Sequence, residues 1–217
     1  MTTNKEDYLK AIYHCGGVSG RVTTKAVALR LGIASASVTE MLARIAKEGL
    51  ISYEPYKGTQ LTDKGVAACI NVVRSHELWE VFLVRYLGYS LSEAHNDAEA
   101  LEHATSSLLA ERLDELLKHP DFCPHGAAIP RPGNIPSVRD MVLLSSLPAG
   151  SMAIVGQVEE EKELLDYLER LGIKVGAPLS IQGFGEYEGP VELMLDGRSI
   201  QLSRKAADQI WVLNHQA

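Results

Sequence analysis

The first 62 residues constrain the fold of this chain more than any other part. Apolar residues recur with helical spacing up to Gly16-Gly17, again from about Thr24 to Gly32, and a third time from Ser35 to Gly49. A short connection separates the second of these predicted helices from the third. Three helices with so tight a turn between the last two are typical of a helix-turn-helix.

A β-hairpin is predicted directly after these helices. Residues 50–53 and 59–62 form two strand-like runs on either side of a turn from Pro55 to Gly58. Asn4 and Ser35 are expected as the N-caps of the first and third helices. Three helices followed by a hairpin predict a winged helix-turn-helix, in which the third helix enters the major groove of DNA. A generic small helical domain is the alternative.

Two longer helices are predicted next. Residues 63–87 form one helix that ends at Gly88, and a second begins with Ser92 as its N-cap and runs to about Lys118. Their apolar surface exceeds what the small N-terminal domain covers. We therefore expect them to pack together and against a second copy of the chain, which makes a homodimer.

The last third of the chain changes character. Residues 126–148 are rich in Pro and Gly and are predicted to be a linker. Strands are predicted beyond it at 152–158, 178–183, 191–195, 199–202 and 211–213, with a helix at about 160–171. A small SH3-like β-barrel fits this pattern. The predicted fold class is mainly α with small β, and has a winged helix-turn-helix, a helical domain and an SH3-like domain.

Charge and targeting signals narrow the function classes. Residues 1–65 hold nine Lys/Arg and six Asp/Glu, or +3, and the other residues hold twelve and twenty-two, or −10. A basic head favours contact with phosphate, and an acidic body favours contact with cations. The sequence has no signal-peptide segment, no apolar run near the roughly 20 residues that span a membrane, and three scattered cysteines. We expect a cytoplasmic protein without membrane contact.

The two long helices carry residues that bind metal ions in other proteins. Their spacings of three or four residues place them on shared helix faces. They are His76 and Glu80 on the first helix, and His95, Glu99, Glu102 and His103 on the second. His and carboxylate side chains on facing helices are typical of di-metal bundles. The alternative is a solvated polar face.

Cys123 and His125 follow the second long helix and suggest a further metal site. No tetrahedral Cys/His zinc pattern is complete. The sequence also has no Gly-rich phosphate loop and no His-Glu-x-x-His motif. A metallohydrolase is the chief alternative from another class, because such ligands hold a nucleophilic water. It needs a substrate cleft, which the sequence does not indicate, and we expect no enzyme.

Five motifs carry a family resemblance. They are Glu6-Asp7-Tyr8-Leu9, Ser37-Val38-Thr39-Glu40-Met41, His76-Glu77-Leu78-Trp79-Glu80, the run from His95 to His103, and Cys123-Pro124-His125-Gly126. Over essentially its whole length, the chain resembles the diphtheria-toxin-repressor family of metalloregulators, in particular its manganese-responsive branch. The resemblance implies a metal-dependent repressor that binds palindromic double-stranded operator DNA as a homodimer and controls metal-uptake genes.

The resemblance implies two metal positions. The first would use Asp7, His76, Glu99, Glu102 and His103. The second would use Glu80, Cys123, His125 and a carboxylate of the C-terminal domain, with His95 as a further candidate. Glu160 is the chosen carboxylate, and its neighbours Glu159, Glu161 and Glu163 are the alternatives.

The identity of two residues separates the branches of this family. Position 7 is Asp and position 99 is Glu, where iron-sensing relatives carry sulfur ligands. Hard carboxylates in place of soft sulfur favour Mn²⁺, with Fe²⁺ and Zn²⁺ as the other candidates. Compact manganese regulators have a carboxylate one helical turn after the aspartate, whereas this chain has Lys10.

The third helix of the N-terminal domain supplies the predicted DNA contacts. They are Ser35, Ser37, Thr39, Glu40, Arg44 and Lys47. Hydroxyls and helix amides can meet phosphate, Glu40 can accept from cytosine, and the two cations can contact the DNA backbone. The predicted domains are residues 1–63 for DNA binding, 64–125 for dimerisation and metal binding, 126–148 as linker, and 149–217 as an SH3-like, FeoA-like domain.

Overall fold

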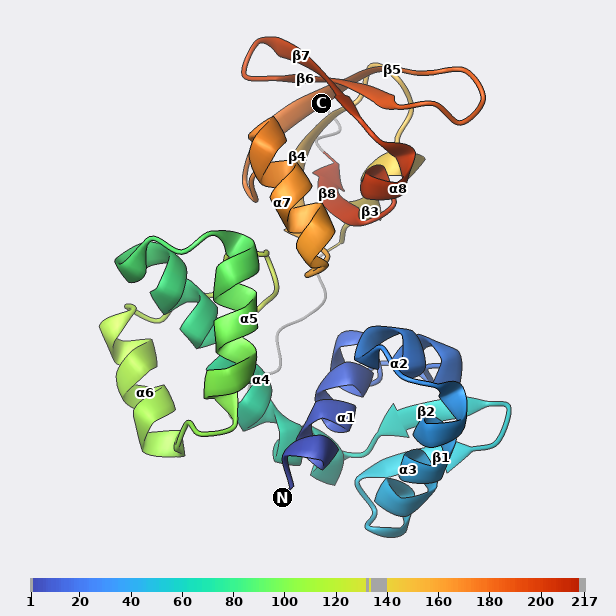
Figure 1. The fold of residues 1–217 in the computed structure, drawn as a ribbon, viewed down its shortest axis with the longest axis vertical. Helices are drawn as coiled ribbons and strands as arrows, with labels where there is room; N and C mark the ends of the chain where they lie inside the picture. Colours follow the sequence, from blue (N-terminus) through green and yellow to red (C-terminus); the bar gives the residue numbers. More distant parts are fainter. Residues whose placement is uncertain (1, 132, 134–139, 215–217) are drawn as a thin grey trace. The chain divides into compact units, whose positions relative to one another are not determined.

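The computed structural model describes residues 2–131, 133 and 140–214 (Figure 1). Positions 132 and 134–139 of the predicted linker lie outside the described residues. The chain divides into two compact units. One comprises the described residues of Met1–His76, Ala100–Arg112 and Pro130–Ile135, and the other those of Glu77–Glu99, Leu113–Ile129 and Pro136–Ala217.

The first unit begins with three helices around a small core. They are α1 (Thr3–His14), α2 (Thr24–Leu31) and α3 (Ser35–Lys47). Helices α2 and α3 meet at 110°, as expected for a helix-turn-helix. Leu9, Ile12, Val38, Leu42 and Ile45 are fully buried, and they are the apolar faces that the sequence predicts.

The predicted N-caps of the first and third helices are wrong by two residues and by one residue. Helix α1 starts after Thr2, whose extended backbone places its carbonyl to accept from the N–H groups of Lys5 and Glu6. The cap of α3 is the extended residue Ala34, so Ser35 is the first helical residue. Ser35 is exposed at the start of the helix.

The hairpin of β1 (Ile51–Glu54) and β2 (Gly58–Leu61) completes this domain. The strands are antiparallel, with Ile51 opposite Leu61. Gly58 has a φ of 95°, and a Cβ there would lie 2.3 Å from the carbonyl oxygen of Val22, so only glycine allows this close approach. The predicted winged helix-turn-helix is confirmed.

Helix α4 (Asp63–Leu87) follows with the predicted bounds. The prediction of a single second long helix is wrong, because the chain forms two helices there, α5 (Leu91–Glu102) and α6 (Ser107–Leu116). The chain turns after Glu102, and the Ser106 hydroxyl accepts from the N–H of Leu109 at the start of α6. Ser90, not Ser92, caps α5, through the N–H of Glu93.

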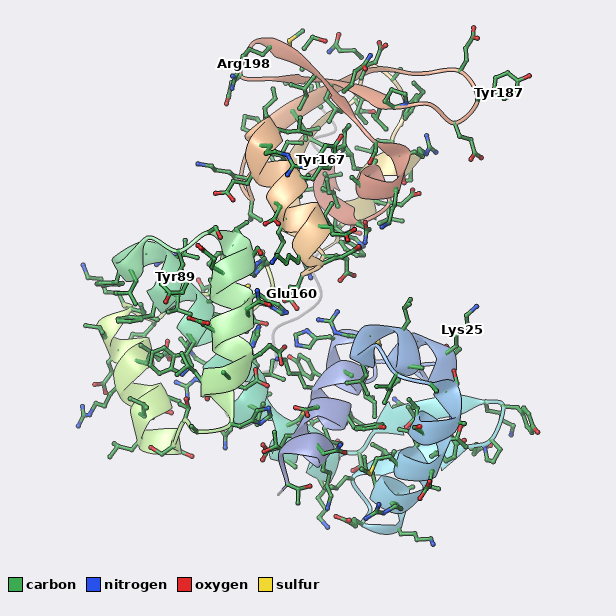
Figure 2. The ribbon with its side chains drawn as sticks, viewed as in Figure 1. Lys25, Tyr89, Glu160, Tyr167, Tyr187 and Arg198 are labelled. Carbon is green, nitrogen blue, oxygen red and sulfur yellow. The ribbon has the colours of Figure 1, made fainter. Side chains whose placement is uncertain are left out.

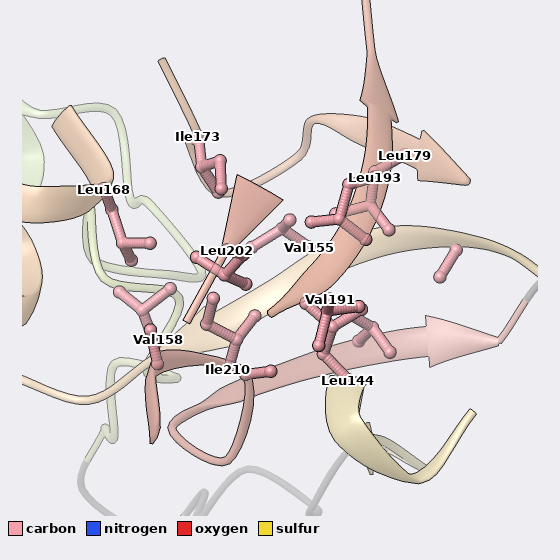
Figure 3. Packing of buried hydrophobic residues seen from close by; sticks show 14 of the residues in the cluster. Leu144, Val155, Val158, Leu168, Ile173, Leu179, Val191, Leu193, Leu202 and Ile210 are labelled. Carbon is pink, nitrogen blue, oxygen red and sulfur yellow. The ribbon is translucent and has the colours of Figure 1, made fainter. Parts of the chain in front are cut away.

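The C-terminal part of the second unit is a sheet of six strands among the described residues, all antiparallel, in the order β3-β8-β4-β5-β6-β7. The strands are β3 (Val142–Leu143), β4 (Met152–Val158), β5 (Pro178–Phe184), β6 (Val191–Leu195), β7 (Arg198–Leu202) and β8 (Ile210–Asn214). Helix α7 (Lys162–Leu171) buries Leu164, Leu165 and Leu168 against them. Figure 3 shows the shared core, to which Val155, Leu193 and Ile210 contribute. The predicted small SH3-like domain is confirmed.

Three short elements of this domain are absent from the sequence prediction. They are β3, the 3₁₀ helix η1 (Leu144–Ser146) and α8 (Arg204–Ala207). Helix α7 also begins at Lys162 rather than near Glu160, which leaves Glu160 in the segment between β4 and the helix. Among the described residues, no single helix is long and apolar enough to cross a membrane; α2 and α3 reach that length only as a bent pair.

Candidate metal centres

The first cluster, in the first unit, joins α1 to the end of α5. Asp7 lies on α1, Glu102 is the last residue of α5, and His103 follows it. The Nε2 atom of His103 is 2.9 Å from Asp7 Oδ1 and 3.3 Å from Glu102 Oε1. Three of the five predicted first-site residues therefore meet.

Glu6 orients the imidazole of this cluster. Its Oε2 atom lies 2.7 Å from Nδ1 of His103, on the side of the ring opposite Asp7. A carboxylate on one ring nitrogen fixes the ring and directs the other nitrogen to a metal ion, which is common around metal-binding histidines. Sequence reasoning missed this role, because Glu6 and His103 lie 97 residues apart.

The carboxylate of Glu102 has two different sides. Its side chain is fully buried, and Oε2 lies 2.6 Å from both the ammonium of Lys10 and Nδ1 of His76. Its Oε1 atom is buried and has no hydrogen-bond partner among the described residues. The imidazole of His76 therefore contacts Oε2 of Glu102, whereas His103 faces Oε1.

The residues of the first cluster fit a divalent cation. Asp7, Glu102 and His103 each offer a donor atom within 4.8 Å of the others. A buried carboxylate oxygen without a partner is costly unless a cation or hydrogen bond compensates it. Oxygen and imidazole donors suit Mn²⁺, Fe²⁺ and Zn²⁺ alike, and carboxylates favour Mn²⁺ more than sulfur does.

Glu99 lies on α5 and belongs to the second unit. Its carboxylate is half exposed, and its Oε1 is 3.8 Å from Nε2 of His95. Its assignment to the first site stays a prediction.

The second cluster lies entirely within the second unit. Nδ1 of His125 is 2.8 Å from Glu80 Oε2 and 4.0 Å from the sulfur of Cys123, and these three side chains are buried. A close backbone approach holds the loop in place. Gly126 has a φ of 91°, and a Cβ there would lie 2.1 Å from the carbonyl oxygen of Gly156 at the bulge in β4.

The buried carboxylates of this cluster shift the pKa values of the two other side chains. Burial opposes protonation of His125, but the charge and hydrogen bond of Glu80 outweigh it and raise the pKa of the imidazole to about 9. Burial, followed by the charges of Glu77 and Glu80, holds the pKa of Cys123 well above its usual range. A divalent cation among these carboxylates would favour the thiolate and the neutral imidazole, which are the forms that bind metal. The donor set fits such an ion.

His95 and Glu160 border this second cluster. Nδ1 of His95 is 3.2 Å from Glu80 Oε1 and 4.0 Å from Glu160 Oε2. Figure 2 shows Glu160 at the end of the C-terminal domain where α7 begins. Of its neighbours, Glu161 instead accepts hydrogen bonds from Gln209 and Lys205.

Glu77 is a member of this environment that sequence reasoning missed. It is fully buried and contributes to the raised pKa of Cys123. Its position three residues before Glu80 places both carboxylates on one face of α4, a spacing from which its part could have been predicted.

The predicted DNA-contacting residues share the outer face of α3. Ser35, Ser37, Thr39, Glu40, Arg44 and Lys47 are all exposed. A surface groove runs beside this helix, and its lining adds residues from the start of α2 and the hairpin that sequence reasoning missed. Among them are Thr23, Lys25 (Figure 2) and Tyr56. Tyr56 at the hairpin tip is fully exposed.

Family models match three consecutive parts of the chain. Residues 1–59 match the N-terminal DNA-binding domain of iron-dependent repressors, and residues 62–131 match their metal-binding and dimerisation domain. Residues 142–214 match the FeoA domain.

Relatives with known names point the same way. The iron-dependent repressor IdeR of Mycobacterium tuberculosis is 30% identical over 195 residues, which are 84% of this chain and 85% of that protein. The transcriptional regulator MntR of Lysinibacillus sphaericus is 33% identical over 117 residues, 54% of this chain and 84% of that protein. A probable metal transport system membrane protein of Chlamydia trachomatis is 39% identical over 87 residues, 40% of this chain; the chain spans only 19% of that protein.

Solved structures agree in fold over nearly the full chain. A manganese-dependent transcriptional repressor in complex with manganese has a TM-score of 0.87 and 32% identity, and covers 97% of this chain and 99% of its own. ScaR with bound Zn²⁺ has a TM-score of 0.80 and 38% identity, with the same coverage. The resemblance found in the sequence is confirmed, and the chain belongs to the iron-dependent repressor family of metal-dependent, DNA-binding transcriptional repressors.

Proposed function

We propose that this chain represses metal-uptake genes by binding palindromic operator DNA as a homodimer when Mn²⁺ is bound at the first cluster. One observation carries the proposal. Asp7 comes from the part of the chain that matches the DNA-binding domain, whereas Glu102 and His103 come from the part that matches the metal-binding domain. A cation held by all three residues ties those two domains together. In this proposal the domains of the chain have the bounds predicted from the sequence.

Asp7, Glu102 and His103 hold the ion in this proposal, with His76 and Glu99 as the further predicted ligands. When bound, Mn²⁺ supplies positive charge to a cluster of carboxylates. Hard oxygen donors and an imidazole support the choice of Mn²⁺, with Fe²⁺ as the second candidate. Related solved structures described as manganese-dependent support the same choice for this chain.

The residues of the cluster give the metal a large effect on the DNA-binding domain. Without a cation, the carboxylates of Glu6, Asp7 and Glu102 repel one another, and the pair of Lys10 with Glu102 offsets only part of that repulsion. To shift an equilibrium between two arrangements from 1:99 to 99:1 takes about 5.5 kcal/mol of differential binding. Several charged ligands around one divalent ion are sufficient for that.

The DNA contact follows from the exposed face of α3. In a homodimer formed through residues 64–118, two copies of α3 must enter successive major grooves about 34 Å apart. The proposed contacts are those predicted from the sequence, namely Ser35, Ser37, Thr39, Glu40, Arg44 and Lys47. Lys25 and Tyr56 join them from the groove beside the helix. Most of these side chains suit phosphate, so DNA shape carries much of the specificity.

The second cluster is proposed as an ancillary metal site that fixes the C-terminal domain. Glu80 belongs to α4, Cys123 and His125 to the loop after α6, and Glu160 to the segment that leads into α7. The N–H of Val158 donates to the carbonyl of His125, so β4 and this loop already contact each other. The thiol makes the site softer than the first, and Zn²⁺ or Fe²⁺ binds there readily.

Operator binding with and without metal tests the proposal. Asp7→Ala should abolish Mn²⁺-dependent binding to a palindromic operator at one fixed salt concentration while the dimer remains. Asp196→Asn is the control, because Asp196 is exposed in a turn where its φ of 48° suits asparagine. Equal operator affinity of Asp7→Ala and the unmodified chain would refute the proposal. Hydrolase activity that the same change abolishes would favour the enzyme alternative instead.

A further inference from the structure

Lys10 is the charged residue of the first cluster that the proposed function leaves without a role. It lies on α1, three residues after Asp7, and is 6% exposed. Its ammonium is 2.6 Å from Glu102 Oε2 and 3.0 Å from Nδ1 of His76. Lysine is almost never fully buried unless it is paired, and these contacts hold its charge beside Glu102 and His76.

The carboxylate of Glu102 separates this ammonium from the rest of the cluster. Oε2 faces Lys10 and His76. Oε1 faces His103, which in turn contacts Asp7. This Oε1 atom has no hydrogen-bond partner among the described residues. One oxygen of the buried carboxylate is thus compensated by a side-chain cation, and the other is not.

Lys10 lowers the negative charge that the first-unit side chains of the cluster carry. Glu6, Asp7 and Glu102 are three carboxylates around His103, and Lys10 is the ammonium beside Glu102. Three carboxylates and one ammonium have a formal charge of −3 + 1 = −2. Without Lys10 the three carboxylates have a formal charge of −3, which attracts a divalent cation more strongly.

We propose that Lys10 is a tethered cation that takes the His76 side of Glu102 and weakens the affinity of the first cluster for divalent metal. The inference rests on the proposed metal site at Asp7, Glu102 and His103. Lys10 adjusts the affinity of the site for metal and is not itself a ligand. It compensates Glu102 in the metal-free protein and repels the incoming ion, so it sets the metal concentration at which the cluster fills.

The two effects of Lys10 have opposite signs. Loss of its charge leaves Glu102 buried without a cation, which destabilises the metal-free protein. The same loss removes a repulsive charge next to the metal position, which tightens metal binding by about tenfold or more. A lysine that only supports the fold would behave differently, because its loss would lower both stability and metal affinity.

Lys10→Gln tests this with Lys5→Gln as the matched control. Lys5 lies on the same helix and pairs with Glu48 at 2.7 Å, and this pair is exposed to solvent. The full chain is stripped of metal by chelation and dialysis. Thermal unfolding is recorded in chelator, and Mn²⁺ binding is measured by calorimetric titration. Asp7→Asn identifies the first-cluster phase of the titration, because that phase disappears in this variant.

Lys10→Gln should lower the melting temperature of the metal-free protein and tighten the first-cluster phase about tenfold or more. Lys5→Gln should leave that phase within about twofold of the unmodified chain. Unchanged or weaker Mn²⁺ binding in a folded Lys10→Gln chain overturns the inference. If Lys10→Gln is unfolded in chelator, recovery of its helical circular dichroism with Mn²⁺ supports the inference, and failure at every Mn²⁺ concentration overturns it. An unmodified chain without an Asp7-dependent phase would refute the proposed function instead.

Discussion

Glu102→Gln should destabilise the metal-free protein strongly. The Lys10–Glu102 pair is buried, with 7% of the lysine side chain and none of the glutamate side chain exposed. Glutamine keeps the shape of the side chain and removes its charge, so the ammonium of Lys10 loses its buried carboxylate partner. Removal of one partner from a buried ion pair costs about 3–5 kcal/mol.

Glu48→Gln is the control, because it removes the charge from a different ion pair of α1. Glu48 also pairs with a lysine of α1, Lys5, at 2.7 Å, and this hydrogen bond lowers the pKa of its carboxyl. The side chains of Lys5 and Glu48 are both accessible to water, which screens the pair, so we expect little change in stability.

Urea unfolding in chelator, followed by circular dichroism, measures the difference. A loss of about 3 kcal/mol or more corresponds to a fall of about 1 M or more in the urea midpoint at ordinary slopes. Saturating Mn²⁺ at about 100 times its dissociation constant adds roughly 2.7 kcal/mol to the unmodified chain. Glu102→Gln should gain much less from Mn²⁺. A Glu102→Gln midpoint equal to that of Glu48→Gln would contradict the reasoning.

Three further predictions concern the second cluster and the dimer. Cys123→Ser and His125→Ala should each raise the Mn²⁺ concentration needed for operator binding without abolishing it; complete loss in either would reverse our ranking of the two clusters. Light scattering should show a dimer at micromolar concentration, and a monomer in the presence of metal would exclude dimerisation through residues 64–118. Because the pKa of His125 is raised from 6.5 to about 9, its protonation stabilises the metal-free protein below pH 6.5, and this contribution is lost as the pH rises through 9. Thermal melts across that range should show the slope, and an equal slope in His125→Gln would rule out this assignment.

The helix faces were predictable because they depend on neighbours in the sequence. Asp63–Leu87 has its predicted bounds since its apolar periodicity is uninterrupted and a glycine follows it. The break between α5 and α6 was missed because no glycine or proline marks it. Its local signal was Thr105-Ser106, two residues that favour caps and turns, with Ser106 accepting from Leu109.

The partners within the clusters were harder to predict, because they depend on contacts between distant segments. The i, i+4 spacing of His76 and Glu80 placed them on one helix face, and only the family resemblance assigned them to two different sites. In the structure, His76 Nδ1 contacts Glu102, and Glu80 contacts His125, 45 residues away. From the sequence, Lys10 was only a residue that departs from the pattern of the compact manganese regulators. Its burial and its distance to Glu102, which only the structure gives, identify it as the cation of a buried ion pair.

The two clusters carry their compensating positive charge in different forms. In the first, a lysine ammonium on α1 sits against the buried carboxylate of Glu102. In the second, protons do this, because Glu80 keeps the imidazole of His125 protonated and burial with Glu77 and Glu80 keeps Cys123 a thiol. A metal ion at the second cluster must displace protons, so its apparent affinity rises with pH. A tethered ammonium is not released in this way. An ion that enters the second cluster therefore competes with protons, whereas an ion that enters the first is opposed by a fixed charge on α1, the helix that also carries Asp7.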